Sequence, residues 1–287
     1  MMSTILRLYE RLGLSPKDIN ATNQIRRAEN QKAREIVFVE IHKWMLVKSQ
    51  ASAALACYLE ELHDESVARA REVVTLTIDL FFGAWRKGVP DPKHGGLYPE
   101  YRWLKKVQWV CEYRDAILWS ACLGDWDAAR RLSQYPSDQT DSDISERKSE
   151  APWYLLLASY LRGDATGSDL AMDDTPPGKP SGKPGTLERL IEEGRSKRMK
   201  HLSAALGAIA RKDAAAVQDR IEQYLAYYRK TEFTRGDWDD MVAIDGSILV
   251  HLAEHEGVPV SVPEKYADYI VRLPPDLVKA TAGTMDG

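Results

Sequence analysis

The chain has 287 residues, of which 44% are apolar and 29% are charged, a composition typical of one or two ordinary globular domains. It excludes a disordered chain and a collagen-like or disulfide-stapled scaffold. The 39 basic and 43 acidic residues leave a net charge of -4, which argues against a dedicated nucleic-acid binder, because phosphate neutralisation requires a basic excess.

The charge is distributed unevenly along the chain. Residues 1–120 carry 18 Lys and Arg against 15 Asp and Glu, a net of +3, whereas residues 121–287 carry 21 against 28, a net of -7. We therefore expect the acidic second half of the chain to attract a basic partner.

The cysteines and the apolar runs indicate the compartment. Cys57, Cys111 and Cys122 form no CxxC pair and lie in apolar helical stretches, so we expect them to be buried free thiols. The sequence from Met1 to Arg7 contains no apolar run of the kind that drives export. Nor does any stretch of roughly 18 residues consist of apolar residues alone. We expect a cytoplasmic protein that has no membrane partner.

Apolar residues recur at helical spacing along almost the whole chain, whereas strict alternation is nearly absent before residue 258. This pattern predicts an all-α protein, either a multi-helix bundle or a short α-solenoid built from αα-hairpins, with a short extended C-terminal tail. In the first half we expect a helix near 3–12, followed within 20–62 by either one long helix or two helices that meet near Lys48–Gln50. The next helix is capped by Asp64 or Ser66 and ends at Gly88. A loop at 89–99 then leads to a helix from Glu100 to Gly124.

Three short sequences predict tight corners between antiparallel helices. They are Gly124-Asp125, Gly163-Asp164 and Lys212-Asp213. Glycine adopts the left-handed conformation that closes one helix, and aspartate caps the first amides of the next. We therefore expect an αα-hairpin at each of these three positions.

A segment rich in proline, glycine and lysine interrupts the second half at 175–185, and such a composition is typical of a flexible loop. It separates an N-terminal helical region, 1–174, from a C-terminal helical region, 186–287, and we expect the two to form one continuous all-α unit. The elements expected beyond the segment are helices at 186–211, 213–230 and 237–256 and an extended stretch at 258–263.

The sequence His251-Leu252-Ala253-Glu254-His255 matches the HxxEH motif of zinc hydrolases, in which the histidines bind the metal and the glutamate activates water. A third protein ligand should follow far downstream, but only 32 residues remain. In the alternative interpretation the histidines border an apolar stripe formed by Ile244, Ile248 and Leu252. This alternative, which we favour, predicts neither a metal nor any other cofactor.

Acidic residues cluster between the first two corners, where residues 124–174 hold eleven acids and five bases, a net of -6. A second cluster places an aromatic residue between carboxylates at the expected start of a helix. We predict that the two clusters bind a partner through Asp138, Asp141, Asp143, Glu146, Glu150, Asp237, Trp238, Asp239 and Asp240.

A series of short sequences between residues 150 and 279 forms a wider pattern. Its elements are Trp153, Leu161-Arg162-Gly163-Asp164, His201–Leu206, Ala210–Asp213, Tyr224–Tyr228, Asp245, Leu249, Leu252-Ala253, Gly257–Val260 and Leu273–Val278. This pattern resembles the polymorphic-toxin immunity proteins of the immunity protein 49 family.

The resemblance implies an all-α cytoplasmic protein that binds a cognate secreted bacterial toxin and neutralises it by stoichiometric occlusion. It implies no catalytic residue, and the sequence likewise contains no nucleophile elbow, P-loop or GxGxxG. The partner would be a toxin domain, such as a basic nuclease or a toxin that acts on nucleotides, and not a nucleic acid. Two other classes remain: a helical-repeat scaffold or adaptor, which would bind peptides promiscuously, and the HxxEH zinc hydrolase.

Overall fold

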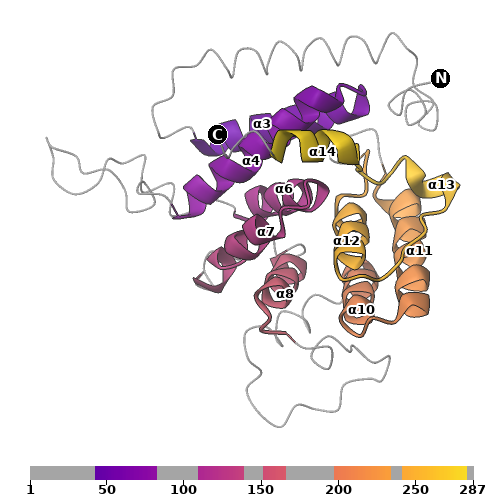
Figure 1. Cartoon of the computed structure of the whole chain (residues 1–287). Helices are drawn as coiled ribbons and strands as arrows, with labels where there is room; N and C mark the ends of the chain where they lie inside the picture. Colours follow the sequence, from indigo (N-terminus) through magenta and orange to yellow (C-terminus); the bar gives the residue numbers. More distant parts are fainter. Residues whose placement is uncertain (1–42, 83–108, 139–150, 166–196, 234–240, 283–287) are drawn as a thin grey trace, which may run out of the picture.

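The described part of the chain consists of α-helices and contains no strand. The structure is a computed structural model, and it describes residues 43–82, 109–138, 151–165, 197–233 and 241–282. Its helices are α3 (Lys43–Leu59), α4 (His63–Phe82), α6 (Trp109–Cys122), α7 (Trp126–Leu132), the 3-10 turn η3 (Tyr135–Asp138), α8 (Ala151–Arg162), α10 (Lys197–Ala210), α11 (Ala214–Thr231), α12 (Ile244–His255), α13 (Glu264–Ala267) and α14 (Pro275–Ala282). The predicted all-α class is thereby confirmed (Figure 1). None of these described helices combines the length and the apolar character needed to cross a bilayer.

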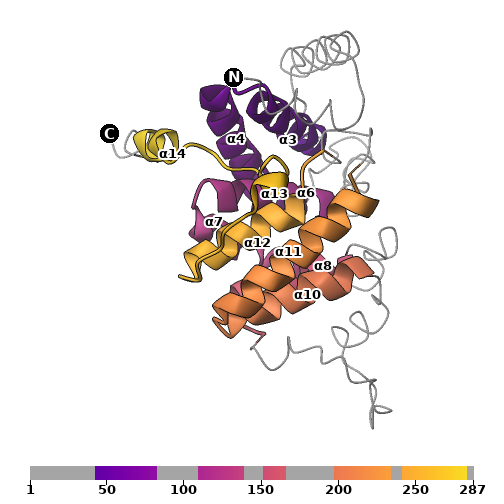
Figure 2. The same cartoon turned by 90° about the vertical axis from the view of Figure 1, so that its right-hand side faces the viewer.

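One hydrophobic core joins the described helices, from Val47 in α3 to Leu273 before α14. The α3–α4 hairpin packs on α6 and α7, whereas α10, α11 and α12 form a second group that meets α6 and α8 (Figures 1 and 2). The largest fully buried side chains include Trp119 on α6 and Trp153 on α8. The three cysteines are buried thiols that form no disulfide, as predicted. Most of the described aromatic side chains therefore fill the core.

Five helices end with the same backbone arrangement. A residue one or two positions after the helix has a positive φ at each of these ends: Glu61 (63°), Gly124 (68°), Gly163 (80°), Lys212 (54°) and Gly257 (75°). The next amide then donates to the carbonyl five residues earlier, over 2.8 to 3.1 Å, which is the bond of a Schellman cap. The helix ends predicted at Gly124, Gly163 and Lys212 are thereby confirmed.

Two of these corners also begin the following helix as predicted. Asp125 accepts a hydrogen bond from the amide of Ala128 at the start of α7 (2.9 Å), and Asp213 accepts one from the amide of Ala216 at the start of α11 (3.0 Å). These bonds satisfy amides that the first turn of a helix leaves without partners. At Gly163 only the end of α8 lies within the described residues.

The first and last described parts of the chain lie side by side. Tyr58 OH, on α3, donates to the carbonyl of Ile270 over 3.0 Å and accepts from the amide of Arg272 over 3.2 Å. Arg71, on α4, donates to the carbonyl of Val278 in α14 over 3.1 Å. The stretch after Val258, predicted to be extended, thus leads into two short helices, of which α14 lies against α4 (Figure 1).

Two predicted element boundaries are wrong, and one open alternative is excluded. Of the two alternatives for 20–62, two helices meeting near Lys48–Gln50 are excluded, because α3 continues through these residues and the buried amide of Gln50 is paired with Arg69 of α4 over 3.0 Å. α4 begins at His63, and Ser66 donates its hydroxyl to the Ala54 carbonyl instead of capping.

The second boundary that is wrong is the start of α12. This helix begins at Ile244, with Ala243 as N-cap, and not at Asp237, so Asp237 cannot cap it. Other expectations, namely the helix near 3–12, the loop at 89–99 and the flexible segment at 175–185, lie outside the described residues. The division of the chain at 175–185 stays a prediction for the same reason.

Glu112, on α6, places a carboxyl group inside the core. The residue is 1% exposed, and its Oε2 has no hydrogen-bond partner. The other oxygen, Oε1, lies 3.9 Å from Lys48 Nζ, and that lysine is partly exposed. Burial raises the pKa of Glu112 to about 7, since the Lys48 charge only partly offsets the lost hydration.

We expect this group to make stability fall as pH rises. A folded-state pKa near 7 lies above the unfolded value, so the folded chain holds the extra proton between about pH 4.5 and 7, and the contribution of Glu112 is most favourable below that window. Glu112→Gln should raise the free energy of unfolding at pH 8 by up to about 3 kcal/mol and flatten its slope between pH 5 and 8. Urea unfolding across this range measures both. Glu72→Gln, at an exposed position of α4, should change neither, and an unchanged slope in Glu112→Gln would contradict the assignment.

Candidate functional site

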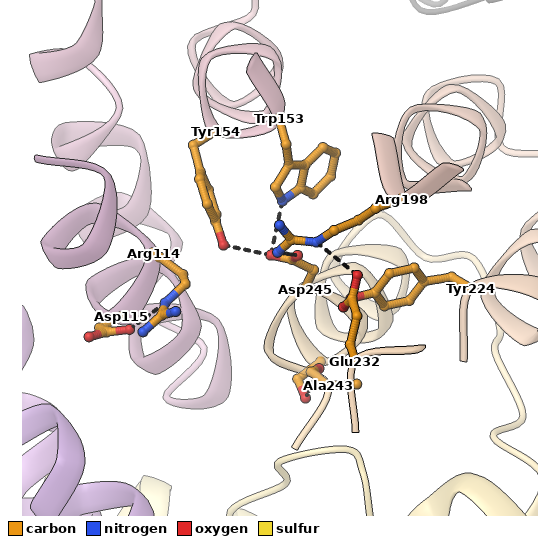
Figure 3. Close-up of polar contacts among 10 residues, drawn as sticks. Arg114, Asp115, Trp153, Tyr154, Arg198, Tyr224, Glu232, Ala243 and Asp245 are labelled. Carbon is orange, nitrogen blue, oxygen red and sulfur yellow. Dashed lines mark hydrogen bonds and ion pairs between the residues drawn. The ribbon is translucent and has the colours of Figure 1, made fainter. Parts of the chain in front are cut away.

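A buried carboxylate, that of Asp245, joins helices from both halves of the described chain. Asp245 lies in the first turn of α12 and is 1% exposed. Trp153 Nε1 and Tyr154 OH, both on α8, donate to its Oδ1 over 3.0 Å and 2.7 Å. Arg198, on α10, donates to Oδ2 and forms an ion pair with it. These four residues, the Asp245 cluster, connect α8, α10 and α12 (Figure 3).

Arg198 extends the Asp245 cluster toward the surface. Its Nε lies 3.4 Å from Oε1 of Glu232, the residue that follows α11. Tyr224 OH, on α11, donates to the other oxygen of Glu232 over 3.5 Å. Asp245 and Glu232 therefore flank one guanidinium, and α11 is connected to the three helices of the cluster (Figure 3).

The electrostatic environment keeps Tyr154, Tyr224 and Arg198 in their hydrogen-bond-donating forms. Burial, and after it the negative charge of Asp245, hold the pKa of Tyr154 well above its usual range, so this hydroxyl remains a donor at neutral pH. The same two causes raise the pKa of Tyr224. Burial disfavours the charge on Arg198, but the attraction of Asp245 outweighs this cost and raises the pKa of the guanidinium.

The residues after Asp245 allow α12 to approach its neighbours closely. A Cβ on Gly246 would lie 3.0 Å from Leu225 Cδ2 and 3.2 Å from Tyr224 Cε1 of α11, so only glycine fits there without displacing a side chain. Ser247 Oγ donates to the Ala243 carbonyl (2.9 Å) and accepts from the Val271 amide (2.9 Å). This turn thus contacts α8, α10, α11 and the C-terminal segment.

The Asp245 cluster is suited to fixing helices in place. Its carboxylate is shielded from solvent, each oxygen accepts at least one hydrogen bond, and its charge is matched by Arg198. A buried ion pair of this kind costs desolvation and is retained where its geometry specifies one arrangement. We infer a positioning role for the cluster, not proton transfer.

A second polar group lies around His251, the first histidine of the HxxEH sequence. Its Nε2 is 2.8 Å from the Val271 carbonyl and 3.5 Å from Cys122 Sγ, and its Nδ1 is 3.7 Å from Glu254. Burial alone would lower the pKa of His251, but Cys122, Glu254 and the carbonyl raise it to about 10. A protonated imidazole donates from both nitrogens and cannot bind a metal.

His255, the second histidine of the sequence, has separate neighbours. Its ring stacks on Trp126, the first residue of α7, with centroids 4.5 Å apart, and its Nε2 lies 3.5 Å from Arg130. Ile248 and Leu252 are buried beside them on α12, which places both histidines at the border of the apolar stripe. Within the described residues, no three His, Cys, Asp or Glu side chains are arranged to hold a metal ion.

The predicted partner-binding residues lie almost entirely outside the described part. Only Asp138 belongs to a described element, as the last residue of η3, and the structure does not describe its side chain. Asp141, Asp143, Glu146, Glu150 and the cluster Asp237-Trp238-Asp239-Asp240 fall in 139–150 and 234–240. Whether these residues share a surface stays a prediction.

The described residues nevertheless locate the acidic excess of 124–174. The carboxylates with described side chains are Asp125, Asp127 and Asp164, and the same ranges contain three arginines, Arg130, Arg131 and Arg162. Two of these carboxylates are paired, Asp127 with Arg130 at 2.7 Å and Asp164 with Arg162 at 2.6 Å. The net charge of -6 therefore belongs to Asp138 and the segments 139–150 and 166–174.

Sequence reasoning did not assign a role to the Asp245 cluster. A signal for Asp245 was present, since a single acid stands in the apolar sequence Met241–Val250, and such a residue must be paired when it is buried. No local signal distinguished Arg198, which lies between Lys197 and Lys200 in a basic stretch.

Comparison of the chain with protein-family models, with curated proteins and with solved structures finds no match. The function must therefore be inferred from the chain's own residues and from their arrangement.

We predict that Asp245→Asn lowers the free energy of unfolding by about 3 kcal/mol, because it leaves the buried Arg198 charge without its main partner. Asp164→Asn, in the exposed pair with Arg162, is the matched control and should cost less than about 1 kcal/mol. Urea unfolding followed by circular dichroism measures both. Arg198→Met combined with Asp245→Asn should cost less than the sum of the two single changes; equal losses for Asp245→Asn and the control would contradict this role.

We also predict that the purified protein binds less than about a tenth of an equivalent of zinc, because His251 contacts the Val271 carbonyl and Cys122 while His255 stacks on Trp126. Atomic emission after dialysis against zinc gives the stoichiometry. One equivalent of zinc that disappears in His255→Ala would instead support the hydrolase interpretation.

Proposed function

We propose that this protein is an immunity protein. It binds a cognate secreted toxin in the cytoplasm of the cell that makes it, and it neutralises the toxin by covering the toxin's active site in a stoichiometric complex. It performs no catalysis of its own under this proposal. The toxin domain carries a basic surface, as a nuclease or a toxin that acts on nucleotides would.

The contact between Trp153 and Asp245 carries this proposal. The two residues are 92 positions apart, they are joined by a buried hydrogen bond of 3.0 Å, and both belong to the sequence pattern that resembles the immunity protein 49 family. Other residues of the pattern are structural in the same way: Tyr224 is buried beside the Asp245 cluster, and Gly163 and Gly257 end helices with positive φ. The pattern therefore marks residues that a shared fold would require, which supports the resemblance.

The location of the acidic excess supports a binding role. The negative charge of 124–174 lies in Asp138 and in segments that connect described helices, while the described carboxylates of that range are balanced by arginine. Connecting segments on a rigid scaffold commonly carry recognition residues. Carboxylates concentrated there would accelerate encounter with a basic toxin surface.

The arrangement of the described polar groups favours binding over catalysis. The Asp245 cluster is enclosed and internally paired, and His251 is held by Cys122, Glu254 and the Val271 carbonyl. A general base must reach the proton it removes from a substrate. The Asp245 cluster presents no such group to solvent, and the exposed carboxylate beside His251, Glu254, is paired with His251 and Arg272.

The test begins with the gene neighbourhood, where a large secreted protein with a variable C-terminal domain should be encoded directly upstream. We predict that co-expression of the intact chain rescues cells that express this C-terminal domain in the cytoplasm, and that the two proteins form a stable complex of fixed stoichiometry. Failure of rescue by the well-folded chain would reject the immunity proposal. Binding of many unrelated peptides at similar affinity, without rescue, would favour the scaffold alternative.

A second set of variants tests whether the predicted acidic partner-binding residues contact the toxin. Asp141→Lys, Asp143→Lys and Glu146→Lys together should slow association with the toxin by about tenfold at low salt and weaken its dependence on ionic strength. Glu72→Lys, Glu264→Lys and Asp276→Lys, at exposed positions elsewhere, make the matched control. Stopped-flow fluorescence measures the rate. If the triple Lys variant rescues cells and its association rate with the toxin is unchanged, the proposed acidic surface is rejected but the immunity function is not.

A further inference from the structure

The α10–α11 hairpin is basic although it lies in the acidic half of the chain. Residues 197–233 contain eight Lys and Arg against four Asp and Glu, a net of +4, whereas residues 121–287 have a net of -7. Two of the four acids serve the fold itself, since Asp213 caps α11 and Glu232 is paired with Arg198. The hairpin thus has a positive charge that its own acids do not neutralise.

The cationic side chains gather along the seam between the two helices. On α10, Lys197 and Lys200 are exposed and His201 is partly exposed; on α11, Lys230 is exposed and Arg220 and Tyr227 are partly exposed. The rings of His201 and Tyr227 lie 5.3 Å apart and connect the two rows. Residues three, four or seven apart share one face of a helix, so the six residues, here named the cationic face, form one strip: Lys197, Lys200, His201, Arg220, Tyr227 and Lys230. Figure 2 shows the two helices alongside each other.

The charges around His201 support this arrangement. The pKa of His201 is lowered first by partial burial and then by the positive charges of Arg220 and Lys197. Among the described residues, no carboxylate acts on this histidine to oppose them. The two remaining acids of α11 accept hydrogen bonds from glutamines of the same helix, Asp219 from Gln223 over 2.9 Å and Glu222 from Gln218 over 2.7 Å.

We propose that the cationic face is a binding surface for an acidic polypeptide segment of a partner protein. The strip offers lysines that form no ion pair with any described residue, an arginine and a tyrosine hydroxyl, which together suit a short row of carboxylates. A polypeptide fits better than a nucleic acid, because the chain as a whole has a net charge of -4 and would repel a long polyanion beyond the strip. The proposal does not depend on the immunity function.

The experiment uses the full-length chain and two labelled probes, octaglutamate and an oligothymidylate of the same length. Fluorescence anisotropy is measured at about 20 and 200 mM NaCl, which changes the screening length severalfold. The test variant is Lys197→Glu with Lys230→Glu. The control is Lys265→Glu with Lys279→Glu, which changes the net charge equally at exposed positions outside the hairpin.

Octaglutamate should bind the native chain at low salt, about tenfold more weakly in the test variant and within about twofold of native in the control. Circular dichroism and thermal unfolding measure whether both variants are folded. If the test variant is unfolded, Lys197→Gln with Lys230→Gln replaces it. Absence of octaglutamate binding, or an equal loss in the control, would overturn the proposal. Tighter binding of the oligothymidylate would overturn it as well and assign the strip to nucleic acid.

Discussion

The rest of the described fold depends on the need to compensate one buried negative charge. A carboxylate removed from water is costly unless a cation and hydrogen-bond donors meet it at short range. Asp245 obtains them from Trp153 and Tyr154 on α8 and from Arg198 on α10. Because these bonds tolerate little displacement, α8, α10 and α12 must meet in one arrangement, whatever path the chain takes between α8 and α10.

Several neighbouring features follow from this constraint. Gly246 has no side chain where α12 approaches Leu225 and Tyr224, so the helix that carries the charge can lie close to α11. Glu232 lies near the outer side of the same arginine and brings the end of α11 into the arrangement. The polar bonds that fix α8, α10, α11 and α12 relative to one another therefore converge at one buried site.

The sequence predicted the features that local chemistry determines. The corners at Gly124-Asp125 and Lys212-Asp213 were predictable, because left-handed residues and aspartate caps act within a few positions of the chain. The class of the fold followed from helical spacing. The alternative of two helices meeting at Lys48–Gln50 is excluded, because a distant partner, Arg69, satisfies Gln50 within one continuous helix. The start expected at Asp237 was wrong, because α12 begins only at Ile244. The Asp245 cluster could not be assembled in advance, since its members are distant in sequence, and the acidic clusters remain predictions because their residues lie outside the described ranges.

The bridge at Tyr58 has a consequence for how the chain is made. Its hydroxyl lies in α3, but the groups it bonds, at Ile270 and Arg272, follow 212 and 214 residues later. Contacts of such sequence separation form late. During synthesis the α3–α4 hairpin leaves the ribosome long before the segment that completes it, with an apolar seam and a tyrosine hydroxyl still unmatched. A nascent chain in this state presents the kind of surface that chaperones bind, until the segment with Ile270 and Arg272 emerges and bonds Tyr58.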